Sequence, residues 1–342
     1  DDPHLYLLET RIIANGNRVD VHRERFGFRQ TWIENGNFYV NGRIFHFNQL
    51  TGPSYHTLDR ASLRAKFQRY KACNINLLRT FYRAAPVMLE IADEVGLFIK
   101  PQSGWHHPRY PLTEHFKNNA KRTLREWITR DRNHPSVVMW CAANEPSRHI
   151  EAVKWVVEQM QLIDPTRPVD VESSYSRSAY DAQDRFIRKP WLAIANLHYP
   201  LVPGTSYPWY PVRWAKTKPK PLFFGEWGDF NGPGRESLGA DRHYAELAKK
   251  TNYSWQGSEM TLKGATAYRE MIIPYWRRLG VSGSNDWISE TILEKEYPFP
   301  RKGKYPIPDS WPVNHRTPVE WNRLDTSGVR FDSVRLNYRA SE

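Results

Sequence analysis

The sequence predicts a parallel α/β fold that closes into a (β/α)8 barrel. Eight apolar runs typical of buried strands lie between residues 44 and 290, and most of them alternate with segments of helical spacing. The stretch has about the length that such a barrel needs, roughly 250 residues. A doubly wound sheet is the competing fold, but it would carry a Gly-rich phosphate-binding turn early in the chain, and this sequence has none there.

The first 30 residues predict β-structure that precedes the βα repeat. Residues 5–8 and 19–21 flank the turn Asn15-Gly16-Asn17, a pattern typical of a hairpin. We interpret residues 1–30 as the last strands of a small β-domain, or as a linker that remains from one. A second hairpin, over residues 38–45 with an Asn41-Gly42 turn, leads into the first barrel strand.

Start and stop signals divide the remaining chain into strands and helices. Asp59 precedes the first helix, Gly96 follows the second, and Asp164-Pro165 ends the fourth. We assign residues 31–290 to the barrel and the Pro-rich, then strand-like residues 291–342 to a C-terminal extension. The expected barrel strands span residues 44–49, 75–80, 97–102, 137–143, 169–172, 192–198, 222–226 and 281–285, and the expected helices span 63–72, 86–95, 118–132, 150–163 and 262–279.

Composition narrows the classes of partner. The net charge of +12 indicates a polyanionic partner or simply a basic surface. Because Lys and Arg are spread along the chain without a basic block, we expect an acidic or sulfated glycan rather than nucleic acid. No run reaches the roughly 18 to 20 apolar residues of a membrane span, so we expect no membrane partner.

Cysteine and histidine spacing predicts no metal site and no cofactor. The two cysteines, Cys73 and Cys141, fall at different depths of the expected barrel, so a disulfide is not expected. The N-terminus lacks the basic start and apolar core of a signal peptide. We expect a secreted or periplasmic protein whose export signal is absent from this chain, with the cytoplasm as the alternative.

Two glutamates stand where barrel strands end. Glu145 closes the fourth expected strand and Glu226 the seventh, so both should face the mouth formed by the carboxyl ends of the strands. Retaining glycosidases need two carboxyl groups about 5 to 5.5 Å apart, one as nucleophile and one as acid/base. For either glutamate alone, the favoured interpretation is a helix-start carboxylate or a salt-bridge partner, whereas the pair in this context favours glycoside hydrolysis. Aromatic residues in loops, among them Trp105 next to His106, fit stacking on sugars or packing in the core.

Several motifs resemble glycoside hydrolase family 2, whose members include β-galactosidases, β-glucuronidases and β-mannosidases. Residues 133–145, NHPSVVMWCAANE, are similar to the acid/base motif of that family. The segment RFGFR at 25–29, followed by Val40-Asn41-Gly42, resembles its junction between an immunoglobulin-like β-sandwich domain and the barrel. Residues 76–80 resemble the second-strand motif that presents an arginine to the site. The resemblance runs from about residue 20 to about residue 290.

The resemblance implies a role for each matching residue. Glu145 would be the general acid/base, Asn144 would bind the 2-hydroxyl of the sugar, and Glu226 would be the nucleophile with Arg79 beside it. An ion pair of purely structural role for Arg79 and a core position for His198 are the alternatives. Residues that would orient the nucleophile or support the sugar are His198, Tyr199 and Trp287.

Departures from the family pattern mark a divergent member. The first strand continues as Phe47-Asn48-Gln49-Leu50-Thr51-Gly52, and the third ends as Lys100-Pro101-Gln102 where an acidic residue is common. No Asn-x-Lys signature for a sugar carboxylate follows Trp287. We expect a retaining, exo-acting, β-galactosidase-like glycosidase. Our hypothesis for its substrate is an acidic or sulfated oligosaccharide. The alternatives are an endo-acting hydrolase of an anionic polysaccharide, a non-catalytic glycan-binding barrel and, from charge alone, a nucleic-acid-binding protein.

Overall fold

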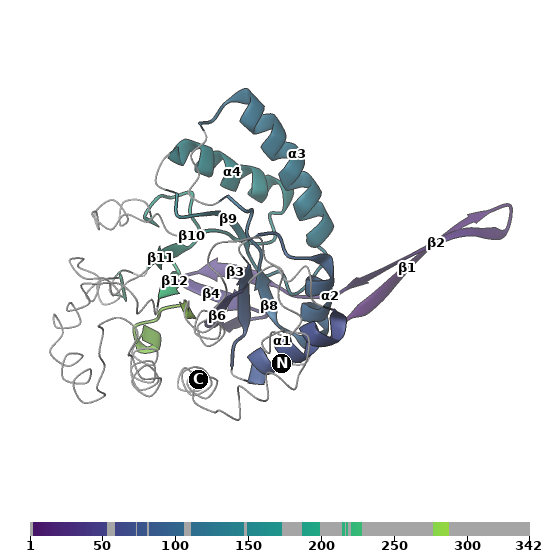
Figure 1. The fold of residues 1–342 in the computed structure, drawn as a ribbon, viewed down its shortest axis with the longest axis horizontal. Coiled ribbons are helices and arrows are strands. Elements are labelled where there is room, and N and C mark those ends of the chain that lie inside the picture. Colours follow the sequence, from purple (N-terminus) through teal and green to yellow (C-terminus); the bar gives the residue numbers. More distant parts are fainter. Residues whose placement is uncertain are drawn as a thin grey trace, which may run out of the picture.

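Eight parallel strands form a barrel in the computed structural model, as the sequence predicts (Figure 1). The structure describes residues 3–52, 59–72, 74–80, 82–105, 111–146, 149–172, 187–198, 214–215, 217, 220–227 and 276–286. Each expected strand coincides with an observed one, with bounds that differ by no more than about three residues. The barrel strands are β6 (Phe47–Gly52), β7 (Leu77–Thr80), β8 (Phe98–Lys100), β9 (Trp140–Asn144), β10 (Val169–Glu172), β11 (Ala195–His198), β12 (Leu222–Trp227) and β13 (Gly283–Asp286).

The strands follow one another around the barrel and return to the first. Six of them hydrogen-bond in the order β11-β12-β13-β6-β7-β8, and β9 pairs with β10. Parallel bridges from Ile99 to Val137 and from Gln102 to Cys141 join β8 to β9. Between β10 and β11, the side-chain amide of Asn196 donates to Asp170 Oδ2 at 2.7 Å. Because all eight strands are parallel, their carboxyl ends lie at one end of the barrel.

A small antiparallel sheet closes the other end. It consists of β3 (Thr31–Glu34), β4 (Asn37–Val40) and β5 (Arg43–Ile44), and the sequence analysis did not predict β3. The Phe38 ring meets the Phe47 ring edge-on, with centroids 5.0 Å apart. These rings pack with Leu77 and Phe223 near the starts of their strands. The first barrel strand therefore begins at residue 47 and not at 44, because residues 43–44 belong to the hairpin.

In the described part of the chain, four complete helices pack outside the strands. They are α1 (Arg60–Ala72), α2 (Pro86–Val95), α3 (Glu114–Asp131) and α4 (Ile150–Ile163). The predicted bounds of α2 and α4 are confirmed, and α2 ends at Gly96, whose φ of 76° is the left-handed conformation that glycine accepts readily. Helix α3 begins four residues before its predicted start, because the Thr113 side chain accepts the N–H of Phe116 and caps it. Residues 262–275 of the fifth predicted helix and the extension 291–342 lie outside the described residues.

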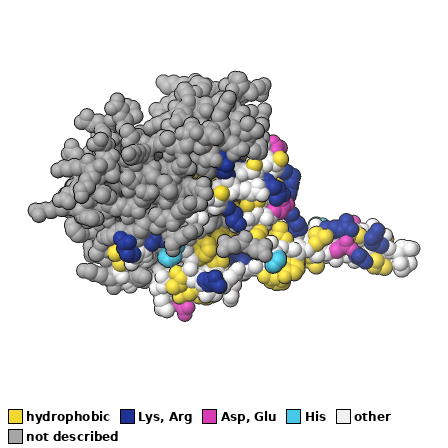
Figure 2. Space-filling model, turned by 90° about the horizontal axis from the view of Figure 1, so that it is seen from below, with side chains coloured by type: hydrophobic (Ala, Val, Ile, Leu, Met, Phe, Trp, Pro, Cys, Tyr) yellow, Lys and Arg dark blue, Asp and Glu magenta, His cyan; other side chains and the backbone are white. Residues whose placement is uncertain are grey.

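The predicted N-terminal hairpin is present and extends away from the barrel (Figure 1). Strands β1 (Tyr6–Ala14) and β2 (Asn17–Phe26) are antiparallel around Asn15-Gly16. Figure 2 shows hydrophobic and basic side chains side by side along it. Assignment of residues 1–30 to a β-sandwich domain stays a prediction. Exposed large apolar side chains on the hairpin are Tyr6, Leu7, Leu8, Ile12, Ile13 and Val19.

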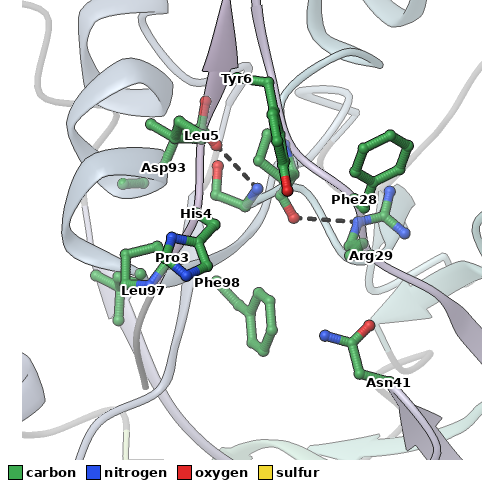
Figure 3. Close-up of a pocket in the computed structure, with 14 residues that line it drawn as sticks. Pro3, His4, Leu5, Tyr6, Phe28, Arg29, Asn41, Asp93, Leu97 and Phe98 are labelled. Carbon is green, nitrogen blue, oxygen red and sulfur yellow. Dashed lines mark hydrogen bonds between the residues drawn. The ribbon is translucent and has the colours of Figure 1, made fainter.

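A cavity of about 380 Å³ lies at the base of the barrel (Figure 3). Its walls come from the N-terminal segment, the end of α2 and the residues that precede β9. Arg29 Nε donates to the carbonyl of Pro135 at 3.1 Å, which ties the segment after β2 to the barrel. Because Phe98 begins β8 and Ser136 precedes β9, this cavity is at the opposite end from the carboxyl ends of the strands. None of the helices in the described part of the chain is long and apolar enough to cross a membrane.

Candidate active site

The two glutamates singled out by the sequence meet at the carboxyl end of the barrel. Glu145 follows β9, the fourth barrel strand, and Glu226 lies on β12, the seventh. Both are buried, with exposed fractions of 8% and 3%. One carboxylate oxygen of each and one ring nitrogen of His198 all lie within 4.8 Å of one another. The strand positions predicted from the sequence therefore bring the two carboxyl groups together.

The strand that carries Glu145 holds it in an unusual backbone conformation. Parallel strands covered on both faces read as continuous apolar runs, and every residue of β9 is buried. At Glu145 the chain turns with a φ of 47°, a region that residues other than glycine seldom adopt. Its N–H donates to the Glu172 carbonyl at 3.0 Å, and the N–H of Asn144 donates to the Trp105 carbonyl at 2.9 Å. Such conformations cost about 1 to 3 kcal/mol and persist where neighbours fix them, commonly at functional sites.

Arg79 on β7 connects the acid pair from within the barrel. Its side chain is fully buried, and Nη1 donates to Glu226 Oε1 at 2.8 Å. Nη2 donates to Gln102 Oε1 at 2.9 Å and to Asn144 Oδ1, while Nε lies 3.4 Å from Glu172 Oε1. Burial lowers the pKa of Arg79, but the charges of Glu172 and Glu226 raise it above its usual value, so the guanidinium is charged. The arginine thus forms an ion pair with the proposed nucleophile itself.

His198 at the end of β11 lies between three carboxylates. Its Nδ1 is 2.9 Å from Glu145 Oε1 and 3.4 Å from Glu226 Oε2, and its Nε2 is 2.9 Å from Glu172 Oε2. Burial lowers the pKa of His198, but Glu226, Glu145 and Glu172 together raise it to about 9. At neutral pH the ring is therefore an imidazolium that donates from both nitrogens. The predicted role of His198 and the alternative of a satisfied core histidine both fit a buried ring with a partner on each nitrogen, so the role stays a prediction.

Glu145, His198 and Glu226 also have the donor set of a cation site. Their atoms are close enough together to share one ion. Both ring nitrogens of His198, however, already face carboxylates, Nδ1 towards Glu145 and Nε2 towards Glu172. Arg79 already neutralises Glu226 from the other side. The donor chemistry of the cluster therefore favours a network of ion pairs over a bound metal.

A second layer of charge lies beneath the pair, and the sequence analysis missed it. Lys100 on β8 contacts Asp170 Oδ2 at 3.0 Å and Glu172 Oε1, and all three side chains are fully buried. Burial raises the pKa of Glu172, but Arg79, Lys100 and the bond from His198 lower it well below its usual range. Burial and the charge of Glu172 together raise the pKa of Asp170. Glu172 ends β10 just as Glu145 and Glu226 stand at the ends of their strands, and that signal could have found it.

Gly225 leaves the space in which this cluster fits. A Cβ atom at this position would overlap Glu172 Oε2 and Asn196 Oδ1, and it would lie 2.9 Å from His198 Nε2. The side-chain amide of Asn285 donates to the Gly225 carbonyl from β13. The residue directly before Glu226 must therefore lack a side chain, because polar groups from two neighbouring strands occupy its place.

Of the four other predicted site residues, the structure describes Trp105. The Trp105 ring packs on Phe116 of α3, with centroids 5.4 Å apart, and adjoins the site through its backbone. His106, Tyr199 and Trp287 lie outside the described residues, so their predicted roles stay predictions. Lys117 and Lys121 lie on α3, where Lys117 pairs with Glu114 at 2.7 Å and Lys121 lies over the Trp155 ring.

Comparison with known proteins identifies relatives. The model of the family described as "Glycosyl hydrolases family 2, TIM barrel domain" matches residues 30–261. The chain is 32% identical over 178 residues to a putative β-glucuronidase of Formosa agariphila, an alignment that covers 49% of the chain and 17% of that protein. It is 27% identical over 262 residues to the β-glucuronidase of Chlorocebus aethiops. That alignment covers 66% of the chain and 38% of the relative. It is 24% identical over 239 residues to a β-galactosidase of Psychromonas ingrahamii. That alignment covers 59% of the chain and 23% of the relative.

Solved structures show the same fold. A β-D-glucuronidase of Dictyoglomus thermophilum superposes with a TM-score of 0.61 at 20% identity, over 83% of the chain and 50% of that protein. A family 2 β-galacturonidase of Eisenbergiella tayi, bound to galacturonate, superposes with a TM-score of 0.68 at 18% identity, over 99% and 58%. At these identities the likeness shows the fold alone. The chain spans less than half the length of each curated relative described above.

Proposed function

The chain belongs to glycoside hydrolase family 2, and from this premise we propose that it is a retaining β-glycosidase. One observation carries the proposal: oxygens of the Glu145 and Glu226 carboxylates lie within 4.8 Å of each other. A gap of this size is closer to the roughly 5 to 5.5 Å between the carboxyl groups of retaining enzymes than to the roughly 6.5 to 9.5 Å that inverting enzymes need to admit a water. The curated relatives named β-glucuronidase and β-galactosidase support the same class of reaction.

The proposed reaction has two displacements. In the first, the Glu226 carboxylate attacks the anomeric carbon while Glu145 gives its proton to the departing glycosidic oxygen. In the second, Glu145 takes a proton from water, and the resulting hydroxide oxygen replaces Glu226 on the sugar. The second step restores both carboxyl groups and gives a product with the original anomeric configuration.

Buried side chains next to the two glutamates position the nucleophile and the substrate. Arg79 holds Glu226 Oε1 at 2.8 Å, which fixes the orientation of the nucleophile. Asn144 accepts a bond from Arg79 through Oδ1, so its amide NH2 group is the one that faces a substrate hydroxyl. A hydrogen bond from Asn144 to the 2-hydroxyl of the sugar would strengthen in the transition state.

For the substrate, we propose the non-reducing end of an oligosaccharide with an acidic or sulfated sugar. The net charge of +12 supports an anionic partner, and two of the relatives are named β-glucuronidases. Rates on aryl β-glycosides of glucuronate, galacturonate and galactose, measured over a range of ionic strength, test the proposal. A preference for the acidic glycosides that weakens with added salt is expected. Equal, salt-independent rates on neutral and acidic sugars would contradict it.

Two alternatives keep the fold and change the activity. An endo-acting hydrolase would release internal fragments from a polysaccharide and leave short aryl glycosides intact. A non-catalytic glycan-binding barrel would bind the same sugars without turnover. A time course of product sizes separates exo from endo cleavage, and calorimetric binding without hydrolysis would identify the non-catalytic barrel.

The variant Glu226→Gln tests the chemistry itself. It removes the nucleophilic charge with little change of shape, so turnover is expected to be abolished while the fold persists. Glu158→Gln is the matched control, because Glu158 lies on the outer helix α4 and only pairs with Lys154 at 3.8 Å. Retained hydrolysis by Glu226→Gln would refute the proposal. NMR of the first product, with the anomer retained, tests the double displacement separately.

A further inference from the structure

Three buried charged residues beneath the catalytic pair have no part in the reaction as described above. Lys100, Asp170 and Glu172 are fully buried, and Lys100 lies between the two acids. On its other side, the Lys100 ammonium is 5.7 Å from the ring centroid of Phe223, in the apolar layer that fills the base of the barrel. Burial of an ion carries a penalty of several kcal/mol, and such groups often add no net stability. Stability alone therefore does not account for these three buried charges.

We propose that Glu172 is a positioning residue, which holds the His198 ring protonated and in fixed orientation between Glu145 and Glu226. In this arrangement Arg79 and Lys100 keep Glu172 ionised. The inference rests on the proposed function of the two glutamates, and it adds a residue that the family resemblance did not supply.

Glu172 contacts the site through both its side chain and its backbone. Its Oε2 accepts the Nε2–H of His198 at 2.9 Å. Its backbone carbonyl accepts the N–H of Glu145 at 3.0 Å, and Oε1 meets Lys100 and, at 3.4 Å, Arg79. One residue therefore fixes the tilt of the ring and the turn that carries the acid/base, so its displacement would disturb both.

Charges surround the His198 ring from several strands. Glu145 faces it from the end of β9, Glu172 from β10 and Glu226 from β12. Arg79 and Lys100 contact the far sides of these carboxylates from β7 and β8. The three acids outweigh burial and raise the pKa of His198 to about 9. Without the Glu172 charge, two carboxylates instead of three face the ring, so a larger fraction of His198 should be neutral near physiological pH.

A protonated His198 would serve the second displacement. After Glu145 has given its proton to the departing oxygen, its carboxylate accepts the Nδ1–H of His198, which stands 2.9 Å away. This bond fixes the orientation of the carboxylate that next takes a proton from water. A neutral ring with its proton on Nε2 would present a lone pair to Glu145 instead and repel that carboxylate.

Glu172→Gln in the full chain tests the proposal. The change removes the charge at nearly constant shape, and Lys100 keeps Asp170 as a partner 3.0 Å away, so we expect the variant to fold. NMR titration of ¹⁵N-labelled histidines reads the ring directly, with His198 identified by the signal that His198→Gln lacks. We expect the pKa of His198 to fall by roughly one unit or more, because the negative charge that faces Nε2 is removed. We also expect kcat to fall on the order of tenfold or more with KM little changed, and the pH profile of kcat to move.

Asp164→Asn is the matched control. Asp164 is also a buried, ion-paired acid, but its partner Arg167, 2.6 Å away, lies on the segment that precedes β10 rather than at the site. This variant should lose stability without moving the titration of His198. A change in His198 as large as that in Glu172→Gln would mean that any loss of a buried acid produces the effect, and it would overturn the proposal.

Glu172→Asp provides a second arm. It keeps the charge of the network but shortens the side chain, so it is the variant to rely on if Glu172→Gln does not fold. Loss of the Nε2 contact should change the ¹⁵N shifts of the ring and lower kcat. Unchanged His198 titration and shifts in a folded Glu172 variant would refute the positioning role. This readout does not depend on turnover, so it is distinct from the result of Glu226→Gln, which decides the proposed function.

Discussion

The Arg79 guanidinium lies 2.8 Å from Glu226 Oε1, although their strands are separated around the barrel by β6 and β13. The contact spans the interior, where both side chains are buried. A cation in the centre of the barrel therefore binds the proposed nucleophile and, through Asn144, the segment of the acid/base. Arg79 and His198 together therefore fix the geometry of the acid pair.

Arg79→Lys should disrupt the site while preserving charge. Lysine offers a single ammonium, and it cannot reproduce the planar set of bonds to Glu226, Gln102 and Asn144. We expect kcat/KM to fall roughly 10²- to 10³-fold, comparable to loss of a key electrostatic donor. Arg60→Lys is the control, since Arg60 forms a half-exposed ion pair with Glu94 at 3.1 Å. Steady-state kinetics of both variants, at equal folded fraction, decide the matter. Near-normal kcat/KM in Arg79→Lys would show that charge alone suffices.

Gly225→Ala should destabilise the protein strongly. The new methyl would overlap the side chains of Glu172 and Asn196, which cannot move without breaking buried bonds. Overpacking of this kind typically costs about 1 to 3 kcal/mol, and displacement of buried ionic groups adds to it. Gly16→Ala is the comparison, because that site is open, and its φ of 74° brings backbone strain alone. Urea unfolding should show the larger loss at residue 225, and equal losses would contradict the steric argument.

The fold and the acid pair were predictable for the same physical reason. Parallel strands buried on both faces appear as short apolar runs, and polar groups at their ends must converge, so residues 137–145 and 222–226 marked two strand ends. The partners of these groups were less visible. Whether Lys100 pairs with β10 depends on how side chains from different strands share the interior, and no local pattern encodes that arrangement.

Short strands and helix ends were also hard to predict from the sequence. The start of α3 depended on a side-chain cap at Thr113 rather than on apolar spacing. The strand β3 has only four residues and is half-buried, so its alternation is weak. In contrast, the Gly96 stop of α2 was visible because left-handed backbone strongly favours glycine.

Stability should decline at alkaline pH through His198. The folded pKa of His198, about 9, exceeds its usual value of 6.5, so the ring contributes stability that is fully present below about pH 6.5 and is lost as pH rises through about 9. The contribution should be on the order of 1 to 3 kcal/mol. Urea unfolding at a series of pH values from 6 to 10 measures it. The difference between the parent chain and His198→Gln isolates this ring from other groups, and a difference that does not change over this range would contradict the assignment.

Glu145→Ala should slow the two displacements unequally, according to the leaving group. When the leaving group is a phenol of low pKa, it departs as the phenolate without a proton, so its release should persist. An alkyl or sugar leaving group needs the acid and should be released on the order of 10²- to 10⁴-fold more slowly. The second displacement still lacks its base, so the glycosyl-enzyme on Glu226 should accumulate and give a burst of aryl alcohol. A small anion such as azide fits the space left by the carboxylate and needs no base to attack. Added azide should therefore raise turnover and yield a β-glycosyl azide. Glu158→Ala, on the outer face of α4, should show neither the burst nor the rescue. A loss of activity equal for all leaving groups and insensitive to azide would remove Glu145 from the acid/base role.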